Sequence, residues 1–492
     1  MVFNSLQFFI FFPVVTILYF LIPHRLRAYL LLTASVVFYM AFIPKYVLIL
    51  AFTIVIDYFA GILIARSEGP HRKGLLALSI AANVGVLAFF KYFNFLNSNV
   101  AAVADALKLH YPVPALAIIL PIGLSFHTFQ AMSYTIEVYR GNYKAETNFI
   151  TYALYVMFYP QLVAGPIERP QNLLHQFREE HTFDYQRVAD GLKLMAWGLF
   201  KKVVIADRLA MFVNLVYDAP RDYEGLTLIA ATVAFAFQIF CDFSGYSDIA
   251  IGSAQVMGFK LMTNFRRPYW SQSIHEFWSR WHISLSTWFK DYFYIPLGGN
   301  KVGWARWQIN LLLTFIVSGL WHGANWTFIT WGALNGFYLV FALWTRGYRA
   351  RFAEAVGFNR RPIIAKGVRI ALTFFLICVS WVFFRAANMS DALYILAHSA
   401  DGLSQAFSRG KLLELVSLIR LACGGSLVNV LAPAVAIIIM EILHNIQEQG
   451  ISIRQTVSSR PPIVRWSLYY GLVMATVLFG SYIPSQFIYF QF

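Results

Sequence analysis

The chain has 492 residues, of which 59% are hydrophobic and only 13% are charged, and its formal net charge is +15. Because soluble globular proteins carry about 25% charged residues, this composition argues against a soluble enzyme and predicts an all-α polytopic membrane protein. The basic residues crowd into the loops, as the positive-inside rule requires of cytoplasmic segments, and this argues against nucleic-acid binding. Cys241, Cys378 and Cys423 lie in or beside apolar surroundings, which predicts buried thiols and no disulfide framework.

The first apolar run, "LQFFIFFPVVTILYFLIP", is predicted to stay on the chain as its first helix. No basic residue precedes it and no small-residue cleavage site follows it, so it does not match a signal peptide. Arg25 and Arg27 come after the run. The N-terminus is therefore expected outside, with the basic end of the helix in the cytoplasm.

Further spans are predicted along the first third of the chain, near residues 28–43, 46–65, 74–96 and 113–138. Arg66, Arg72 and Lys73 then fall on the cytoplasmic side, whereas the loop "DALKLHYPVP" is nearly neutral, as an outside loop should be. Within these spans, Asp57 and Lys91 are interpreted as a buried pair or as side chains that extend to the membrane surface.

The middle of the chain is more polar. Residues 165–190 are expected to form a cytoplasmic loop and an amphipathic helix, and residues 259–307 a long, wet, basic insertion on the same side. Apolar pieces follow near 308–320, 325–345, 366–384, 426–444 and 464–484. We expect about 11 spans, with several half-helices near the middle of the chain. The absence of an evident repeat in the sequence weakens the case for a transporter built from inverted halves.

The segment "SQSIHEFWSRWHISLSTWFK" is predicted to be an amphipathic helix over residues 271–290. At 100° per residue its aromatic residues share one arc, and a narrow polar stripe runs along the edge of that arc, formed by His275, Ser279, His282 and Ser286. One reading is a membrane-surface helix with incidental histidines. The other is that His282 faces a water-filled cavity.

The segment "FCDFSGYSDIAIG" places two carboxylates, Asp242 and Asp248, in the longest apolar stretch. A charge inside the bilayer is costly unless it is paired or faces water. With Gly245 between them, the pattern predicts a discontinuous helix that lines a cavity. The alternative is that the carboxylates are structural and bond to Lys201, to Lys202 or to backbone N–H groups.

His322 stands between two apolar runs and beside Trp321. A neutral histidine in a dry pocket can act as a general base on a hydroxyl, but a hydrogen-bonded core histidine would give the same pattern. There is no HExxH motif and no cluster of cysteines with histidines, so no metal site is expected. The sequence also contains no P-loop, no G-x-S-x-G elbow and no Gly-rich dinucleotide loop, which disfavours an ATPase, an α/β-hydrolase and a dehydrogenase.

Four segments together resemble the membrane-bound O-acyltransferase family: "YPQLVAGPIERP", "FCDFSGYSDIAIG", "NFRRPYWSQSIHEFWSRWHISLSTWFKDYFYIPLGGN" and "GLWHGANWTFITWGALNG". They are most similar to its bacterial branch of alginate O-acetylation and teichoic acid D-alanylation. The resemblance runs in order from the N-terminus to about residue 385. We therefore expect one membrane domain over 1–492, with a motif core at about 120–385 and less characteristic helices over 400–492.

The resemblance implies a ring of membrane helices, with re-entrant and amphipathic helices, around a central funnel or tunnel. It also implies a bacterial inner membrane, with the N-terminus on the periplasmic side. It also implies that His322 and His282 match the two histidines of the family's motifs and are catalytic. The substrate-binding residues expected around them are Asp242, Ser244, Tyr246, Arg280, Trp321 and Asn325. No cofactor is expected to be tightly bound, because the family's donor is a thioester, acetyl-CoA in the alginate-like branch.

Three functions are compatible with the sequence at this point. The first is O-acetylation of an extracellular polysaccharide from cytoplasmic acetyl-CoA, directly or through a periplasmic partner of the SGNH type. The second is transfer of D-alanyl or another acyl group from a carrier protein. The third, of a different class, is a proton-coupled transporter with intramembrane histidines. Membrane lipids are expected partners in each case.

Overall fold

The computed structural model describes residues 1–117, 120–163, 165–404, 408–482 and 487–488. These residues are mostly helical and include no strand, so the all-α prediction is confirmed. The chain divides into two compact units. Unit 1 contains Met1–Met195 and Tyr246–Thr263, and unit 2 contains Ala196–Gly245 and Asn264–Phe492.

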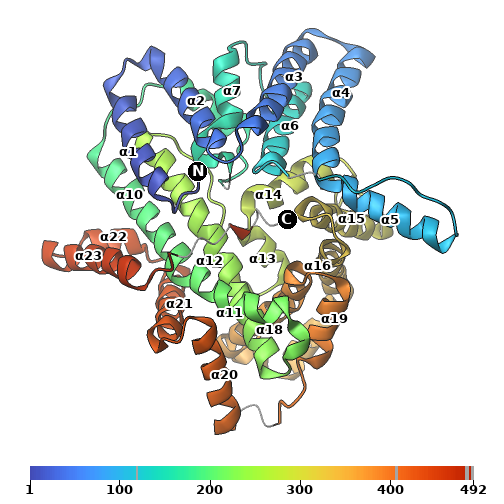
Figure 1. The fold of residues 1–492 in the computed structure, drawn as a ribbon, viewed down its shortest axis with the longest axis vertical. Helices are drawn as coiled ribbons and strands as arrows, with labels where there is room; N and C mark the ends of the chain where they lie inside the picture. Colours follow the sequence, from blue (N-terminus) through green and yellow to red (C-terminus); the bar gives the residue numbers. More distant parts are fainter. Residues whose placement is uncertain (118–119, 164, 405–407, 483–486, 489–492) are drawn as a thin grey trace. The chain divides into compact units, whose positions relative to one another are not determined.

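Unit 1 is built from the N-terminal helices (Figure 1), which are α1 (Leu6–Leu21), α2 (His24–Met40), α3 (Val47–Arg66), α4 (Gly69–Leu87), α5 (Phe93–Ala106), α6 (Leu124–Arg140), α7 (Phe149–Met157), α8 (Tyr159–Leu162) and α9 (Pro170–Leu173). Two helices contribute to both units, α10 (Tyr185–Phe200) and α12 (Leu226–Met257). Helix α1 begins where the Ser5 hydroxyl accepts a hydrogen bond from the Phe8 N–H, and it ends before Pro23, which cannot donate a backbone hydrogen bond.

Asp57 lies in the core of unit 1, on α3. Its carboxylate accepts hydrogen bonds from Ser79 (2.6 Å) and from the Asn83 amide (2.8 and 2.9 Å), both on α4. A buried carboxylate is tolerated where its oxygens are hydrogen-bonded. The predicted alternatives, a buried ion pair or a side chain that extends to the surface, are therefore replaced by a hydrogen-bonded buried acid.

The motif over residues 159–170 also lies in unit 1. Its Glu168 is fully buried, and the carboxylate accepts the Met262 N–H at 2.7 Å. Gln176 makes two further hydrogen bonds with the backbone of Lys260 (2.7 and 2.9 Å). These contacts hold the extended chain that follows α12.

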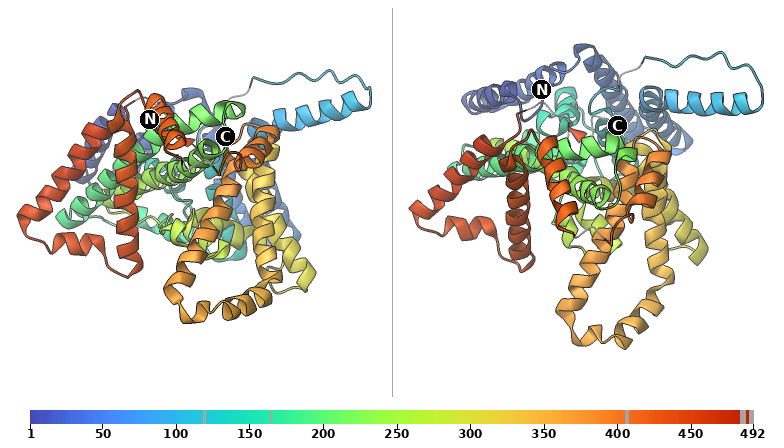
Figure 2. Two further views of the ribbon diagram at one scale, coloured as in Figure 1. Left: turned by 90° about the horizontal axis from the view of Figure 1, so that it is seen from below. Right: turned by 60° about the horizontal axis from the view of Figure 1, so that its bottom comes forward.

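Unit 2 contains the remaining helices, which are α11 (Asp207–Asp218), α13 (Ile274–Arg280), α14 (Ile283–Phe289), α15 (Trp304–His322), α16 (Trp326–Trp344), α17 (Arg346–Ala355), α18 (Pro362–Arg385), α19 (Met389–His398), α20 (Arg409–Ala422), α21 (Leu427–Glu448), α22 (Ile453–Ser458) and α23 (Pro462–Phe479). Helices α15 and α16 form an antiparallel hairpin, and α18 packs against α16 (Figure 2).

Short turns of other helical types join these elements. Among the described residues, three of them have π geometry, over Ala88–Tyr92, Lys201–Ala206 and Lys290–Tyr294. The others are 3-10 turns, over Pro44–Tyr46, Leu174–Arg178, Pro220–Asp222, Pro268–Trp270 and Phe358–Arg360.

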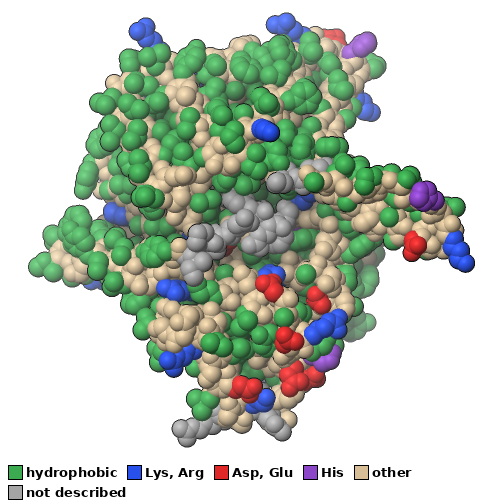
Figure 3. Space-filling view, viewed as in Figure 1, with side chains coloured by type: hydrophobic (Ala, Val, Ile, Leu, Met, Phe, Trp, Pro, Cys, Tyr) green, Lys and Arg blue, Asp and Glu red, His purple; other side chains and the backbone are tan. Residues whose placement is uncertain are grey.

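Seven helical stretches among the described residues are long and apolar enough to cross a membrane: Pro44–Arg66, Gly69–Ala106, Leu226–Met257, Trp326–Trp344, Pro362–Arg385, Leu427–Glu448 and Pro462–Phe479. Apolar side chains also cover wide areas of the visible face (Figure 3), as expected where lipid replaces water. The multi-pass prediction is confirmed. The predicted count of 11 is not, because helices such as the 16-residue α1 are shorter than the roughly 20 residues that a span needs.

Candidate active site

The hairpin of α15 and α16 determines where His322 lies. His322 is the last residue of α15, and α16 begins three residues later at the N-cap Asn325, whose side chain accepts the Thr327 N–H at 3.1 Å. The two helices can approach closely because Gly319 and Gly332 carry no side chain. A Cβ at Gly319 would lie 2.2 Å from the Phe328 carbonyl oxygen, so no larger residue fits there without moving backbone.

The His322 side chain is only 4% exposed and is enclosed by aromatic rings. Its ring centroid lies 4.9 Å from that of Trp321, 5.0 Å from that of Trp331 and 5.3 Å from that of Phe384, each in an edge-to-face arrangement. These rings come from α15, α16 and α18. They exclude water and fix the orientation of the imidazole.

His282 lies between α13 and α14, at a sharp change of direction. Its backbone is left-handed, with φ 41° and ψ 55°, which is rare for a residue other than glycine. The side chain is 1% exposed. Its ring contacts Phe243 (4.6 Å between centroids) and lies almost parallel to Phe265 (6.4 Å).

Burial lowers the pKa of the His282 imidazole from its ordinary value of 6.5 to about 3, because the charged form loses its solvation. The imidazole is therefore neutral at physiological pH. A neutral imidazole keeps one nitrogen that accepts and one that donates a hydrogen bond.

Trp321 connects the two histidines. Its ring centroid lies 6.3 Å from that of His282 and 4.9 Å from that of His322. Two histidines that are 40 positions apart in the sequence thus lie beside one indole, within unit 2. Both predicted catalytic residues and one predicted substrate-binding residue are brought together here.

The structure overturns the prediction of a discontinuous helix at Gly245. Helix α12 runs without interruption through this residue. Gly245 instead permits a close approach to α10, because a Cβ there would lie 2.7 Å from the Gly198 carbonyl oxygen. The glycine therefore serves helix packing.

The carboxylate of Asp242 has the structural role that the alternative reading described. It forms an ion pair with Lys202 at 2.7 Å, and Lys202 also pairs with Asp207 at 2.7 Å. The Ser244 hydroxyl accepts a hydrogen bond from Lys201 at 2.8 Å. Asp242 and Ser244 thus anchor the π turn over residues 201–206 to α12, and their substrate-binding role stays a prediction.

The remaining predicted binding residues also have partners within the chain. Arg280 pairs with Glu276 at 2.6 Å and with Glu448 at 2.7 Å. Asn325 caps α16 and donates to the Ala387 carbonyl at 3.0 Å. Tyr246 belongs to unit 1, where its hydroxyl donates to Asn4 at 3.2 Å. Binding of substrate by these three residues remains a prediction.

The predicted single helix over residues 271–290 is wrong. The chain forms two short helices, and the break falls at His282. The polar stripe is divided as a result, because His275 and Ser279 are exposed whereas His282 is buried. The chain around His282 is therefore closely packed, in contrast to the water-exposed insertion that was predicted.

Comparison with known proteins decides the family. The family model described as "MBOAT, membrane-bound O-acyltransferase family" matches residues 115–384, more than half of the chain and the part that contains both histidines. The chain belongs to this family. The predicted resemblance and the prediction of an O-acyltransferase are both confirmed.

Several relatives of this acyltransferase have names that describe their activity. A protein of Pseudomonas aeruginosa named "Probable alginate O-acetylase" is 41% identical over 80% of this chain and 73% of its own. The "Peptidoglycan O-acetyltransferase" of Helicobacter pylori is 36% identical over 74% of this chain and 72% of its own. The "Teichoic acid D-alanyltransferase" of Streptococcus thermophilus is 28% identical over 54% of this chain and 68% of its own.

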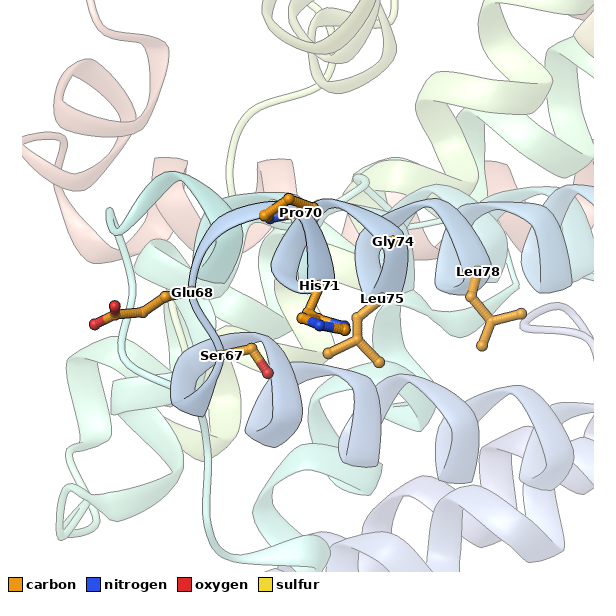
Figure 4. Close-up of a pocket in the computed structure, with 7 residues that line it drawn as sticks. All are labelled: Ser67, Glu68, Pro70, His71, Gly74, Leu75 and Leu78. Carbon is orange, nitrogen blue, oxygen red and sulfur yellow. The ribbon is translucent and has the colours of Figure 1, made fainter.

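Other features of this acyltransferase do not belong to the histidine site. A surface hollow in unit 1, shown in Figure 4, is lined by Ser67, Glu68, Pro70, His71, Gly74, Leu75 and Leu78, none of which was predicted to act in catalysis. In the part of the chain that the structure describes, no group of His, Cys, Asp or Glu side chains is arranged to hold a metal ion.

Sequence reasoning missed the residues that surround the histidines. Phe243, Trp331 and Phe384 form the walls of the two histidine sites, but each lies in an apolar run where one aromatic residue resembles the next. Asn264 was also missed. It opens the motif that contains His282, and its side chain accepts two hydrogen bonds from Ser284, but the sequence pattern does not signal these bonds.

Proposed function

We propose that this acyltransferase moves an acetyl group from cytoplasmic acetyl-CoA to a hydroxyl of a cell-envelope polysaccharide, directly or through a periplasmic partner of the SGNH type. The observation that carries the proposal is the pair of buried histidines that both lie beside the Trp321 indole. The relatives at 41% and 36% identity are named for O-acetylation of alginate and of peptidoglycan. These names support an acetyl donor and a polymer acceptor.

The transfer needs a base at the acceptor hydroxyl. We assign this role to His322, whose imidazole removes the hydroxyl proton as the oxygen attacks the thioester carbon. The C–S bond then breaks, and the thiolate of CoA takes the proton back from the imidazolium. The products are the acetyl ester and CoA with a free thiol, so charge and protons balance.

His282 has a different role in this proposal. Its pKa of about 3 makes it a weak base but leaves it able to donate one hydrogen bond. We assign it to the donor, where its N–H stabilises the negative charge that develops on the carbonyl oxygen. The apolar walls strengthen this interaction because they exclude water.

D-alanyl transfer is the less favoured alternative. The relative named for it is 28% identical and matches 54% of this chain, whereas the relatives named for O-acetylation match 74% or more. A protein whose substrate is the D-alanyl group of a carrier would not transfer acetyl from CoA, so the two readings are separable by donor.

The proposal is tested by substituting His322 in cells that make the polymer. His322→Ala should remove acetyl esters from the secreted polymer, with at least a hundredfold loss expected for a missing general base. The measurement is mass spectrometry of the purified polymer, with the amount of folded protein in the membrane determined in parallel.

A matched control is His398→Ala, in which a histidine that bonds to the Tyr394 carbonyl at 3.0 Å is lost from α19. This variant should acetylate normally. A normal acetyl content of the polymer in His322→Ala cells would show that His322 is not the base, and it would contradict the proposal.

A further inference from the structure

His282 is held in its left-handed conformation by contacts on both of its sides. On one side, the Arg266 N–H donates to the Arg280 carbonyl at 2.9 Å. On the other, the Ile283 N–H donates to the Asn264 carbonyl at 2.9 Å. Only Trp281 and His282 lie between these two bonded positions, so the short connection has little freedom to relax.

The side chain of Asn264 adds a second level of restraint. Its Oδ1 atom accepts both the Ser284 N–H (3.3 Å) and the Ser284 hydroxyl (2.9 Å). Both residues are fully buried. Because an unsatisfied buried donor is costly, these bonds resist any rotation of the chain that would move Ser284 away.

The restraint acts against the preference of the sequence. Residues 271–290 have the pattern of one continuous helix, and the left-handed backbone of His282 is less favourable than a relaxed helical one. Strained backbone of this kind persists only where its surroundings impose it, and it is found most often at functional sites. The side-chain bonds between Asn264 and Ser284 oppose a return of residue 282 to the right-handed helical conformation.

We propose that Asn264 is a positioning residue for catalysis, which keeps the His282 imidazole against Trp321 and Phe243 by holding residue 282 in the left-handed conformation. The inference rests on the proposed function, in which His282 acts on the thioester donor. We assign Asn264 no contact with donor or acceptor, and it acts through His282.

Asn264→Ala tests the proposal in membranes that contain the full chain. The probes are acetyl-CoA at varied concentration and unacetylated polymer as acceptor. The kcat should fall about tenfold to a hundredfold, as for a misplaced catalytic group, whereas the KM for acetyl-CoA should change by no more than about twofold.

A second readout follows the imidazole directly. Diethyl pyrocarbonate modifies accessible histidines, and peptide mass spectrometry reports the modified fraction at each position. His282 should be protected in the parent protein because it is 1% exposed, and it should become reactive in Asn264→Ala. The modified fraction of His282 does not depend on the acyl-transfer reaction. It therefore tests the position of the imidazole even if acetyl-CoA proves to be the wrong donor.

Asn310→Ala is the matched structural control. Asn310 is also a buried asparagine in unit 2 that holds a turn, through its bonds to the carbonyls of Leu297 (3.2 Å) and Gly299 (3.1 Å). It should leave His282 protected. Equal losses of kcat in the two variants, or a protected His282 in Asn264→Ala, would overturn the proposal.

If Asn264→Ala does not fold, Ser284→Ala decides the question. It removes one of the two hydrogen bonds to Asn264 Oδ1 and leaves the backbone N–H in place. A smaller loss of kcat together with partial reactivity of His282 supports the proposal. An unchanged kcat and a protected His282 contradict it.

Discussion

His282 shows how much of a site is determined by single residues. Its type and its place beside tryptophans were visible in the sequence, and so was the isolated position of His322 in an apolar run. The left-handed backbone was not, because no helical pattern signals a break that is imposed by Asn264, 18 positions earlier. Hydrogen bonds between distant positions have no periodic signature, and for this reason the positioning residue was missed.

Protonation of His282 should couple stability to pH. The unfolded chain takes up a proton on this residue as the pH falls below 6.5, whereas the folded protein does so only near pH 3. The free energy of unfolding contributed by His282 is thus fully present above 6.5 and is lost as the pH falls toward 3. His282→Asn should keep the left-handed backbone, which asparagine tolerates, and remove this dependence.

The check is the midpoint of thermal unfolding in detergent at pH 7.5 and pH 5. The parent protein should lose more stability between the two pH values than His282→Asn does. If both lose the same amount, the histidine is not buried in its neutral form.

At the scale of the element, the glycine-lined hairpin of α15 and α16 holds His322. Gly332→Ala would place a Cβ 2.2 Å from the Phe315 carbonyl oxygen, which is backbone and cannot move aside cheaply. Alanine normally stabilises a helix by about 1 kcal/mol relative to glycine. At Gly332 we expect the alanine to destabilise the protein instead. Both the yield of folded protein and the rate of acetyl transfer should fall.

Gly367→Ala is the control for this prediction, because a Cβ at Gly367 on α18 meets nothing within 4 Å. It should be neutral or stabilising by size-exclusion and thermal-unfolding measurements. A Gly332→Ala protein as stable as Gly367→Ala would show that the hairpin is less tightly packed than the structure indicates.

The ion pairs at the π turn make a second prediction at this scale. Lys202→Met would leave Asp207 and Asp242 buried without their shared lysine, and breaking a buried pair in this way costs about 3–5 kcal/mol. The folded yield should fall sharply and recover in part when Asp242→Asn is added. No recovery in the double variant would mean that Asp242 contributes little to the cost.

The elements also show where pattern reasoning fails. Helices α3, α16 and α18 begin and end close to their predicted limits, because their length and apolar composition are enough to identify a membrane span. Gly245 was misread as a break, since a glycine in a helix can equally serve close packing. The polar stripe over residues 271–290 was misread because a helical period describes a possible helix, not one that tertiary contacts permit.

At the scale of the whole molecule, composition and motif order carried the most information. The low charge and long apolar runs predicted a multi-pass helical protein, and the order of four motifs predicted the acyltransferase family that the comparison shows. What they could not supply is the convergence of His282 and His322 on one indole, because that depends on how α13, α15, α16 and α18 pack in unit 2.

The central claim is that His322 acts in the transfer of acetyl from acetyl-CoA to a polymer hydroxyl. The most direct measurement supplies radiolabelled acetyl-CoA to inside-out membrane vesicles and follows base-labile label into the polymer fraction. Vesicles with the parent protein should incorporate label, and vesicles with an equal amount of His322→Ala should incorporate at least a hundredfold less. Equal incorporation by the two, or none by the parent protein, would contradict the account.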